Sequence, residues 1–175
     1  MTSSDLARFE AQMLPHLDAA YTLARYLMRD VHDAEDVVQD ACLRALKYFN
    51  GYRGDGGTSA RAWLLTIVRN TARTWHRRGQ VEGLTTEFDE AQHSQAVVDD
   101  RPEASSLGSD AKETLGRALD HLAPEFREVI VLRELQGLSY KEIGEVAGVP
   151  VGTVMSRLSR ARARLQEVLR AEEER

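Results

Sequence analysis

The sequence predicts an all-α protein made of two small helical modules joined by a flexible acidic linker. Apolar residues recur at helical spacing on both sides of a middle segment, residues 79–108, which has no sustained period of its own. That segment carries seven acidic side chains and one basic one, a net charge of −6, whereas the net charge of the whole chain is −5. We therefore expect modules at residues 1–78 and 109–175, with a linker at 79–108.

The first module begins with helical stretches over residues 6–29, which Pro15 is expected to bend or break. A regular helix follows over residues 33–49, because its apolar residues keep the i, i+3, i+4, i+7 pattern. The opposite face of this helix carries an exposed leucine among acidic and amide side chains: Asp36, Gln39, Asp40 and Leu43. This pattern is compatible with a protein-docking surface and equally with an ordinary solvated face.

Residues 50–58 are rich in glycine and predict a loop, and Thr58 or Ser59 can cap the helix that follows, to about residue 78. The outer face of this helix is basic, with Arg61, Arg69, Asn70, Arg73 and Arg77, and two aromatic residues, Tyr52 and Trp63, lie near its start. Arginines beside aromatic rings suit single-stranded nucleic acid, because bases stack while guanidiniums hold the backbone. The alternative is that Trp63 and Trp75 are only core residues.

The second module contains a helix-turn-helix pattern. Ser139 and Glu142 form a capping box for a first helix, Gly148 can end that helix, and a second helix begins near Val151. The second helix has an apolar stripe, and a polar and basic set lies within an acid-free stretch: Thr153, Ser156, Arg157, Arg160, Arg162 and Arg164. Such a face suits the major groove of DNA, although arginine-rich helices also occur as plain solvated helices.

Composition excludes several classes of protein. A single cysteine, Cys42, excludes an intramolecular disulfide and a cysteine-based zinc site, and the five histidines have no metal-ligand spacing. We expect no cofactor, no metal and no enzymatic activity. The first ten residues lack the pattern of a signal peptide and the longest apolar run is too short to span a membrane, so we expect a cytoplasmic protein.

The chain resembles the extracytoplasmic-function (ECF) sigma factors, the smallest bacterial sigma factors. The stretches that carry the resemblance are residues 33–46, DAEDVVQDACLRAL; residues 60–78, ARAWLLTIVRNTARTWHRR; and residues 122–165, from LAPEFREVIV to SRARARL. The order and separation of these three stretches are more specific to the family than any one stretch alone. The resemblance implies a sigma-2 module followed by a sigma-4 module, with no sigma-3 between them.

The resemblance also implies a role for each surface. Asp36, Gln39, Asp40 and Leu43 would dock on the β′ clamp helices of core RNA polymerase, and the β flap is a further expected contact with the polymerase. The −10 element would be recognised and opened by Tyr52, Arg61, Trp63, Arg69, Asn70, Arg73 and Arg77. The −35 element would be read by the helix that begins at Val151, where we expect Arg157 to contact bases and Arg162 or Arg164 to contact phosphates. An anti-sigma factor is an expected partner. The alternative function is a helix-turn-helix repressor or activator that does not bind core polymerase.

Overall fold

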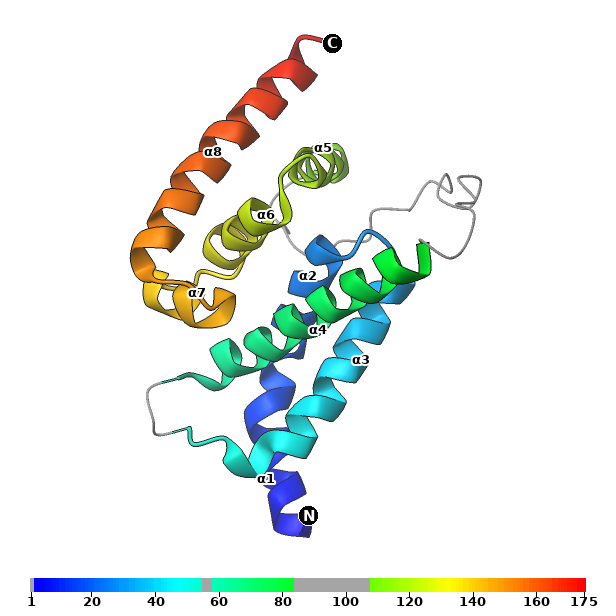
Figure 1. Cartoon of the computed structure of the whole chain (residues 1–175), viewed down its shortest axis with the longest axis vertical. Coiled ribbons are helices and arrows are strands. Elements are labelled where there is room, and N and C mark those ends of the chain that lie inside the picture. The colour runs from blue at the N-terminus through cyan, green and yellow to red at the C-terminus, as the bar shows by residue number, and fades with distance from the viewer. Residues whose placement is uncertain (1, 55–57, 84–107) are drawn as a thin grey trace.

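The computed structural model describes residues 2–54, 58–83 and 108–175, and its regular elements in these ranges are all helices (Figure 1). The expected all-α fold class is confirmed. The first module comprises α1 (Ser3–Met13), the short turn η1 (Leu14–His16), α2 (Leu17–Leu27), α3 (Val31–Tyr48), the turn η2 (Phe49–Gly51) and α4 (Ala60–Gly83). The second comprises α5 (Ser109–Asp120), α6 (Pro124–Ile130), η4 (Val131–Leu135), α7 (Tyr140–Ala147) and α8 (Val151–Glu173).

Local chemistry explains where several of these helices begin. Pro15 lies in η1, between α1 and α2, so the expected break is confirmed. The carboxylate of Asp30 accepts hydrogen bonds from the backbone N–H groups of His32 and Asp33, and α3 therefore begins at Val31, two residues earlier than expected. Ser59 Oγ accepts from the backbone N–H of Ala62, which is the expected cap of α4.

The predicted linker at 79–108 falls largely outside the described residues. Residues 79–83 continue α4 for about one more turn beyond the expected end near residue 78. Residues 84–107 are not described, so the flexibility expected of them stays a prediction.

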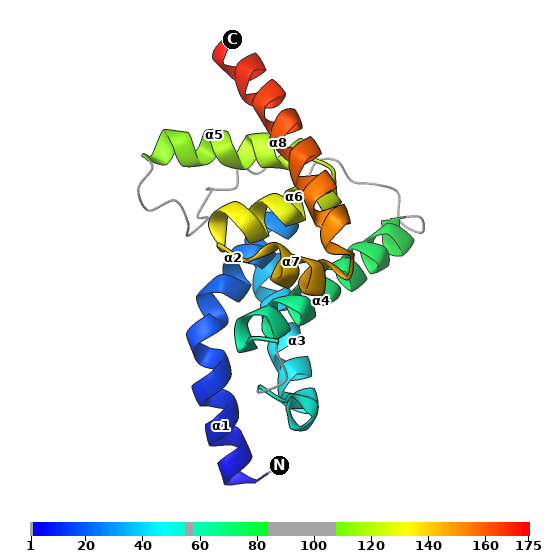
Figure 2. The same ribbon diagram turned by 90° about the vertical axis from the view of Figure 1, so that its left-hand side faces the viewer.

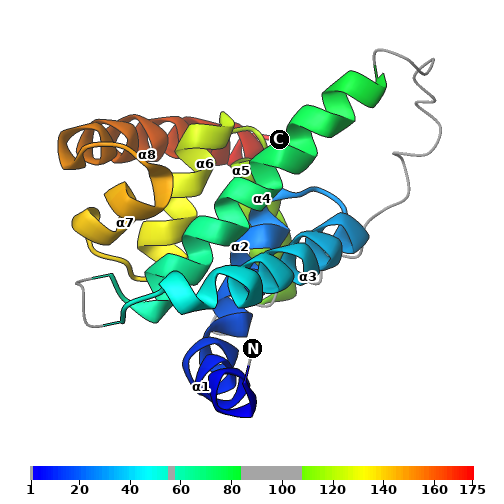
Figure 3. The same ribbon diagram turned by 60° about the horizontal axis from the view of Figure 1, so that its bottom comes forward.

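The two modules pack directly against each other, an arrangement that the sequence did not predict. Helix α2 lies between α3 and α4 of its own module on one side and α6 on the other (Figure 1). Helix α7 lies on α4, as Figure 2 shows, and α8 packs on α6 and α7. Helix α1 projects away from this body (Figure 3). The helix-turn-helix is therefore seated on the basic helix of the first module.

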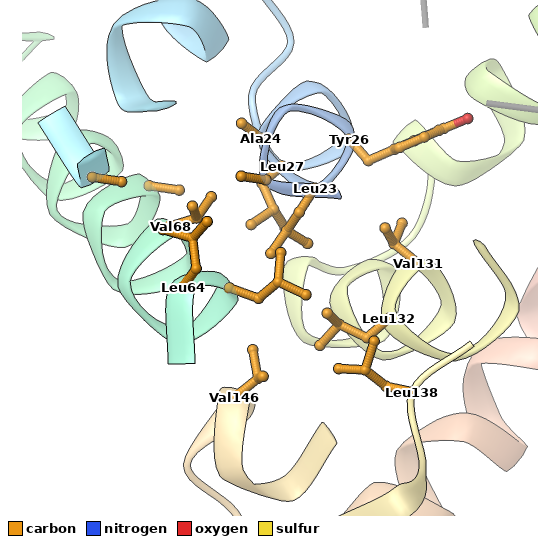
Figure 4. Close-up of a cluster of buried hydrophobic side chains, with 14 of the residues drawn as sticks. Leu23, Ala24, Tyr26, Leu27, Leu64, Val68, Val131, Leu132, Leu138 and Val146 are labelled. Atoms are coloured by element: carbon orange, nitrogen blue, oxygen red, sulfur yellow. The ribbon is translucent and has the colours of Figure 1, made fainter. Parts of the chain in front are cut away.

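One continuous apolar cluster joins the modules. Leu23 and Leu27 of α2 and Leu64 of α4 face Leu132 and Val146 of the second module (Figure 4). All five side chains are less than a tenth exposed. The burial of apolar side chains is the dominant favourable contribution to packing, so contact between the modules belongs to the core of the protein and not to its surface.

Candidate nucleic-acid interface

The helix-turn-helix is built as its sequence predicts. Ser139 Oγ accepts from the Glu142 N–H at 3.1 Å, and the Glu142 carboxylate accepts from the Ser139 N–H at 3.2 Å, which completes the capping box of α7. Helix α7 ends at Gly148, whose φ of +69° lies in the left-handed region. Pro150 then precedes α8, so these local signals are confirmed.

The turn between α7 and α8 also depends on Gly144. A Cβ atom at this position would lie 2.8 Å from the carbonyl oxygen of Val149, closer than real Cβ contacts come. The Val149 N–H donates to the Gly144 carbonyl at 3.0 Å, so the chain reverses directly over this residue. Glycine here lets the two helices approach closely enough for α8 to be held at a fixed angle to α7.

Helix α8 divides cleanly into an inner and an outer face. Val154, Leu158 and Ala161 point inward and are each no more than 1% exposed. The side of the helix opposite them is exposed and consists mostly of small or polar residues: Gly152, Ser156, Ser159, Arg160 and Ala163. Small residues and one arginine on a projecting helix let the backbone approach base edges closely in a major groove.

The first four of the predicted −35 residues do not all lie on the same face of α8. Ser156 and Arg160 lie on the exposed outer face, and Arg160 has no ion pair within the described part of the chain. Thr153 and Arg157 are half-buried, and Arg157 lines the cavity between α8 and the first module.

Arg162 and Arg164 are both exposed and both paired with acids. Arg162 donates to Glu134 at 2.7 Å, and this hydrogen bond raises the pKa of Arg162 above its ordinary value. Arg164 donates to Glu167 at 2.9 Å. Exposed pairs of this kind are weak, so both guanidiniums remain available to phosphates.

Sequence reasoning missed Met155 and Ser159 as members of the exposed part of α8. Met155 is 54% exposed beside Ser156, and Ser159 follows one turn later. The signal that would have found them is their distance around the helix from the buried stripe, because neither residue is basic. An exposed methionine on such a helix can contact the methyl group of thymine.

The predicted −10 residues of α4 fall into two groups. Asn70, Arg73 and Arg77 are exposed, as expected. Arg61 and Arg69 instead contact the second module: Arg61 donates to the backbone carbonyl of Gln136 at 3.0 Å, and Arg69 is only 9% exposed.

Arg69 forms a buried ion pair with Glu128 of α6. Its Nε donates to Glu128 Oε1 at 2.5 Å, and the two side chains are 11% and 5% exposed. Burial raises the pKa of the Glu128 carboxyl, and the adjacent Arg69 guanidinium partly offsets that rise. Arg73 and Arg157 also stabilise the charged carboxylate electrostatically.

A cavity of about 520 Å³ lies beside this ion pair, where α4 meets α6 and α8. Its charged lining includes Arg69, Arg73, Glu125, Glu128 and Arg157. The predicted −10 and −35 surfaces therefore meet at one place in this structure.

Tyr52 and Trp63 belong to an aromatic cluster next to the loop before α4. Their ring centroids lie 4.8 Å apart, and Tyr52 also stacks on Phe49 at 5.9 Å. Both side chains are half-buried, and burial raises the pKa of the Tyr52 hydroxyl. Trp75 is half-buried as well and packs on the apolar cluster. The tryptophans are therefore anchored in the core, and Trp63 keeps part of its ring open to a base.

The face of α3 that was predicted to dock on a protein is exposed. Leu43 is 67% exposed, with Asp36 and Gln39 exposed on the same side. Asp40 is half-buried and pairs with Arg44 at 3.2 Å. The face therefore presents one large apolar side chain surrounded by acids and an amide.

The described ranges contain no group of three or more histidine, cysteine, aspartate or glutamate residues that could hold a metal ion. Within the same ranges, no helix combines the length and the hydropathy needed to cross a membrane.

Comparison with known proteins gives a consistent result for both modules. The family model for sigma-70 region 2 matches residues 13–81, and the model for sigma-70 region 4 matches residues 112–165. The ECF RNA polymerase sigma factor SigE of Mycolicibacterium smegmatis is 38% identical over 161 residues, which is 88% of this chain and 58% of SigE. The RNA polymerase sigma-H factor of Pseudomonas aeruginosa is 31% identical over 94% of this chain and 88% of its own length.

Among solved structures, the chain is similar to the sigma factor RpoE of Bartonella quintana in its co-crystal structure with the anti-sigma factor NepR. The TM-score is 0.78 at 32% identity, covering 93% of this chain and 97% of RpoE.

Proposed function

The chain belongs to the ECF RNA polymerase sigma factors, and we propose on that premise that it directs core RNA polymerase to specific promoters and helps to open the −10 region. The observation that carries the proposal is the match of two separate modules, in order, to sigma-70 regions 2 and 4. The polymerase performs the phosphoryl transfer, and the sigma factor supplies DNA contacts. We expect no chemistry from this chain itself.

In this proposal the second module reads the −35 element with α8. The exposed residues Met155, Ser156 and Arg160 would face base edges, because they project away from the buried stripe. Arg157 and Arg164 lie on one flank and Arg162 on the other, where the two phosphate backbones of a major groove run. The sequence-based prediction that Arg157 contacts bases stays a prediction, and its half-buried flank position makes Arg160 the stronger candidate.

The first module would bind the −10 element. The exposed residues Asn70, Arg73 and Arg77 form a basic strip along α4 that can hold a single strand. The half-open ring of Trp63, with Tyr52 beside it, offers a stacking surface for an unpaired base. Stacking on an aromatic ring stabilises each bound base by about 1–3 kcal/mol, which helps to hold melted DNA open.

The acidic face of α3 would dock on core polymerase. Leu43 supplies an apolar anchor, and Asp36 and Gln39 supply polar contacts around it. A repressor or activator that works without core polymerase would not need a docking face of this kind on α3. The first module's match to sigma-70 region 2 also favours the sigma-factor function.

An anti-sigma factor is the proposed regulatory partner. RpoE of Bartonella quintana has been crystallised with such a partner, and this chain covers 97% of that protein.

Transcription in vitro with core polymerase, followed by sequencing of the start sites, tests the proposed function. We expect transcripts that share −35 and −10 sequences and that depend on adding this chain. The matched control is the Leu43→Arg variant, which should lose these transcripts while it keeps its helical content. If the wild-type chain binds DNA but never stimulates transcription with core polymerase, the repressor alternative is correct.

A further inference from the structure

The cavity where α4 meets α6 and α8 has a lining with more positive than negative side chains. Its volume is about 520 Å³, and four arginines and two glutamates line it, a formal net charge of +2 when the lining histidine is neutral. The whole chain carries −5, so the charge of this lining is opposite in sign to that of the protein. A cleft lined by one sign of charge concentrates ions of the other sign, so this cavity favours an anion.

Two of the four arginines are held by the protein itself. The Nε of Arg69 donates to the Glu128 carboxylate, and both side chains of this pair are nearly buried. Arg127 donates to three backbone carbonyls within residues 119–122. These two guanidiniums therefore belong to the wall of the cavity, and Arg69 neutralises one of its two carboxylates.

The other two arginines have free donors. Arg73 of α4 and Arg157 of α8 line the cavity from different helices, and neither has a hydrogen-bond or ion-pair partner among the residues that the structure describes. Both lower the pKa of the Glu128 carboxyl against the larger effect of burial, so both guanidiniums lie near the same buried group. Two guanidiniums with unoccupied N–H donors thus converge on one cavity.

The remaining carboxylate and the size of the cavity define what kind of anion fits. Glu125 is exposed, so water and salt screen its repulsion of an anion. The volume lies within the range of about 300–1,000 Å³ that is typical of small-molecule sites. Apolar side chains, among them Leu27, Ala72 and Val149, complete the lining. The site therefore suits a small molecule with charged groups at one part and an apolar or weakly polar remainder.

We propose that this cavity binds a small molecule that carries a diphosphate group, with Arg73 and Arg157 each holding one phosphoryl group. A guanidinium fork binds two oxygens of one phosphoryl group, so two separate forks match a diphosphate better than a single phosphate. Inorganic pyrophosphate and the nucleoside diphosphates share this chemistry. The ligand would touch both modules at once.

Such a ligand would compete with promoter DNA. The proposed function gives Arg73 to the −10 strand and Arg157 to the −35 element, and the phosphates of ligand and DNA need the same N–H donors. This competition, unlike the site itself, rests on the proposed function. The concentration of the diphosphate compound would then set how much of the free chain can bind DNA.

The first test is isothermal titration calorimetry of the full chain with pyrophosphate, ADP and GDP. Hydrogen bonds to charged groups are strong, so Arg73→Gln and Arg157→Gln should each weaken binding by about tenfold to a hundredfold. The matched controls, Arg77→Gln and Arg160→Gln, remove the same charge from exposed positions on the same two helices that do not line the cavity. The controls should bind like wild type. If they lose as much affinity as the cavity variants, or if wild type binds none of the three compounds, the proposal is overturned.

Two further variants separate ligand contacts from misfolding. Arg157→Lys keeps the positive charge near Glu128 but loses the planar fork, so it should fold and still bind more weakly than wild type. Glu125→Gln removes a carboxylate from the lining and should strengthen binding. Circular dichroism verifies the helical content of each variant, and if Arg157→Gln does not fold, Arg157→Lys takes its place.

The choice of compound tests the diphosphate itself. Orthophosphate should bind at least about tenfold more weakly than pyrophosphate, because it cannot occupy both forks. Equal affinity for the two would refute the assignment of one phosphoryl group to each arginine. Tighter binding of ADP or GDP than of pyrophosphate would identify a nucleoside diphosphate as the ligand, and equal binding would identify the inorganic ion.

Displacement of a fluorescent −10 single strand by pyrophosphate tests the competition, and transcription with core polymerase keeps the two proposals apart. If the chain directs specific transcripts but binds none of the three compounds, only the ligand site is wrong. If the compounds bind as expected but no transcripts appear, the proposed function fails while the site stands.

Discussion

Leu158→Ala should destabilise the protein much more than Met155→Ala, although the two residues lie three positions apart on α8. Leu158 is 1% exposed and lies between Val154 and Ala161 on the buried stripe, whereas Met155 is 54% exposed. Truncating a fully buried leucine leaves a cavity and costs about 2–5 kcal/mol. Each kcal/mol shifts the Tm of a chain of this size by about 2–4 °C. We therefore expect Leu158→Ala to lower the Tm by about 4–20 °C.

Thermal melts followed by circular dichroism measure this difference, and binding of a −35 duplex provides the second measurement. Met155→Ala should change the free energy of unfolding by no more than about 0.5 kcal/mol, because its side chain is mostly in solvent. The same variant should weaken binding of −35 duplexes that carry thymine at the contacted position. If Met155→Ala lowers the Tm more than Leu158→Ala does, the inner and outer faces of α8 have been assigned incorrectly.

Three further predictions concern the other surfaces. Leu43→Arg should weaken retention on core polymerase without lowering the Tm, because Leu43 is 67% exposed; unchanged retention in a pull-down would contradict the docking role. Arg160→Ala should cost roughly 1–3 kcal/mol of binding free energy on a −35 duplex and relax base preference at one or two −35 positions. Arg164→Ala should instead weaken binding to all −35 sequences alike. Binding to a panel of −35 substitutions, with Arg157→Ala measured alongside, separates base contacts from phosphate contacts. Gly144→Ala should lower the Tm in a thermal melt, because the new Cβ would clash with the Val149 carbonyl. Overpacking of this kind typically costs about 1–3 kcal/mol, whereas alanine gains about 1 kcal/mol in helix propensity over glycine. A higher Tm would show that the turn can relax.

The helix-turn-helix was predictable because its signals are local. The capping box at Ser139 and Glu142 and the left-handed Gly148 each act over a few residues, and each forms as expected. The buried stripe of α3 was predictable for a similar reason, since the i, i+3, i+4 pattern depends only on the helix itself.

The packing of the modules was not predictable from the sequence. Arg69 and Glu128 lie 59 residues apart, and nothing in helical periodicity pairs a basic outer face with a distant acid. The arginines of α4 all look solvent-exposed on a helical projection, yet the second module covers Arg61 and Arg69 and leaves Arg73 and Arg77 free of cover. On α8, the pattern of charge predicted Arg157 as a base contact. The structure shows that the uncharged residues Met155 and Ser159 are exposed on this helix, whereas Arg157 is half-buried.

The apolar cluster shared by the two modules also limits how sigma factors of this kind can evolve. Recombination that joined the first half of this gene to the second half of a relative's gene would set Leu64 and Val68 against unfamiliar side chains at the positions of Leu132, Leu138 and Val146. Such a hybrid could keep both DNA-binding surfaces intact and still lose the packing of the two modules against each other. Promoter specificity in this lineage should therefore change more readily by substitutions on the exposed face of α8 than by exchange of whole modules.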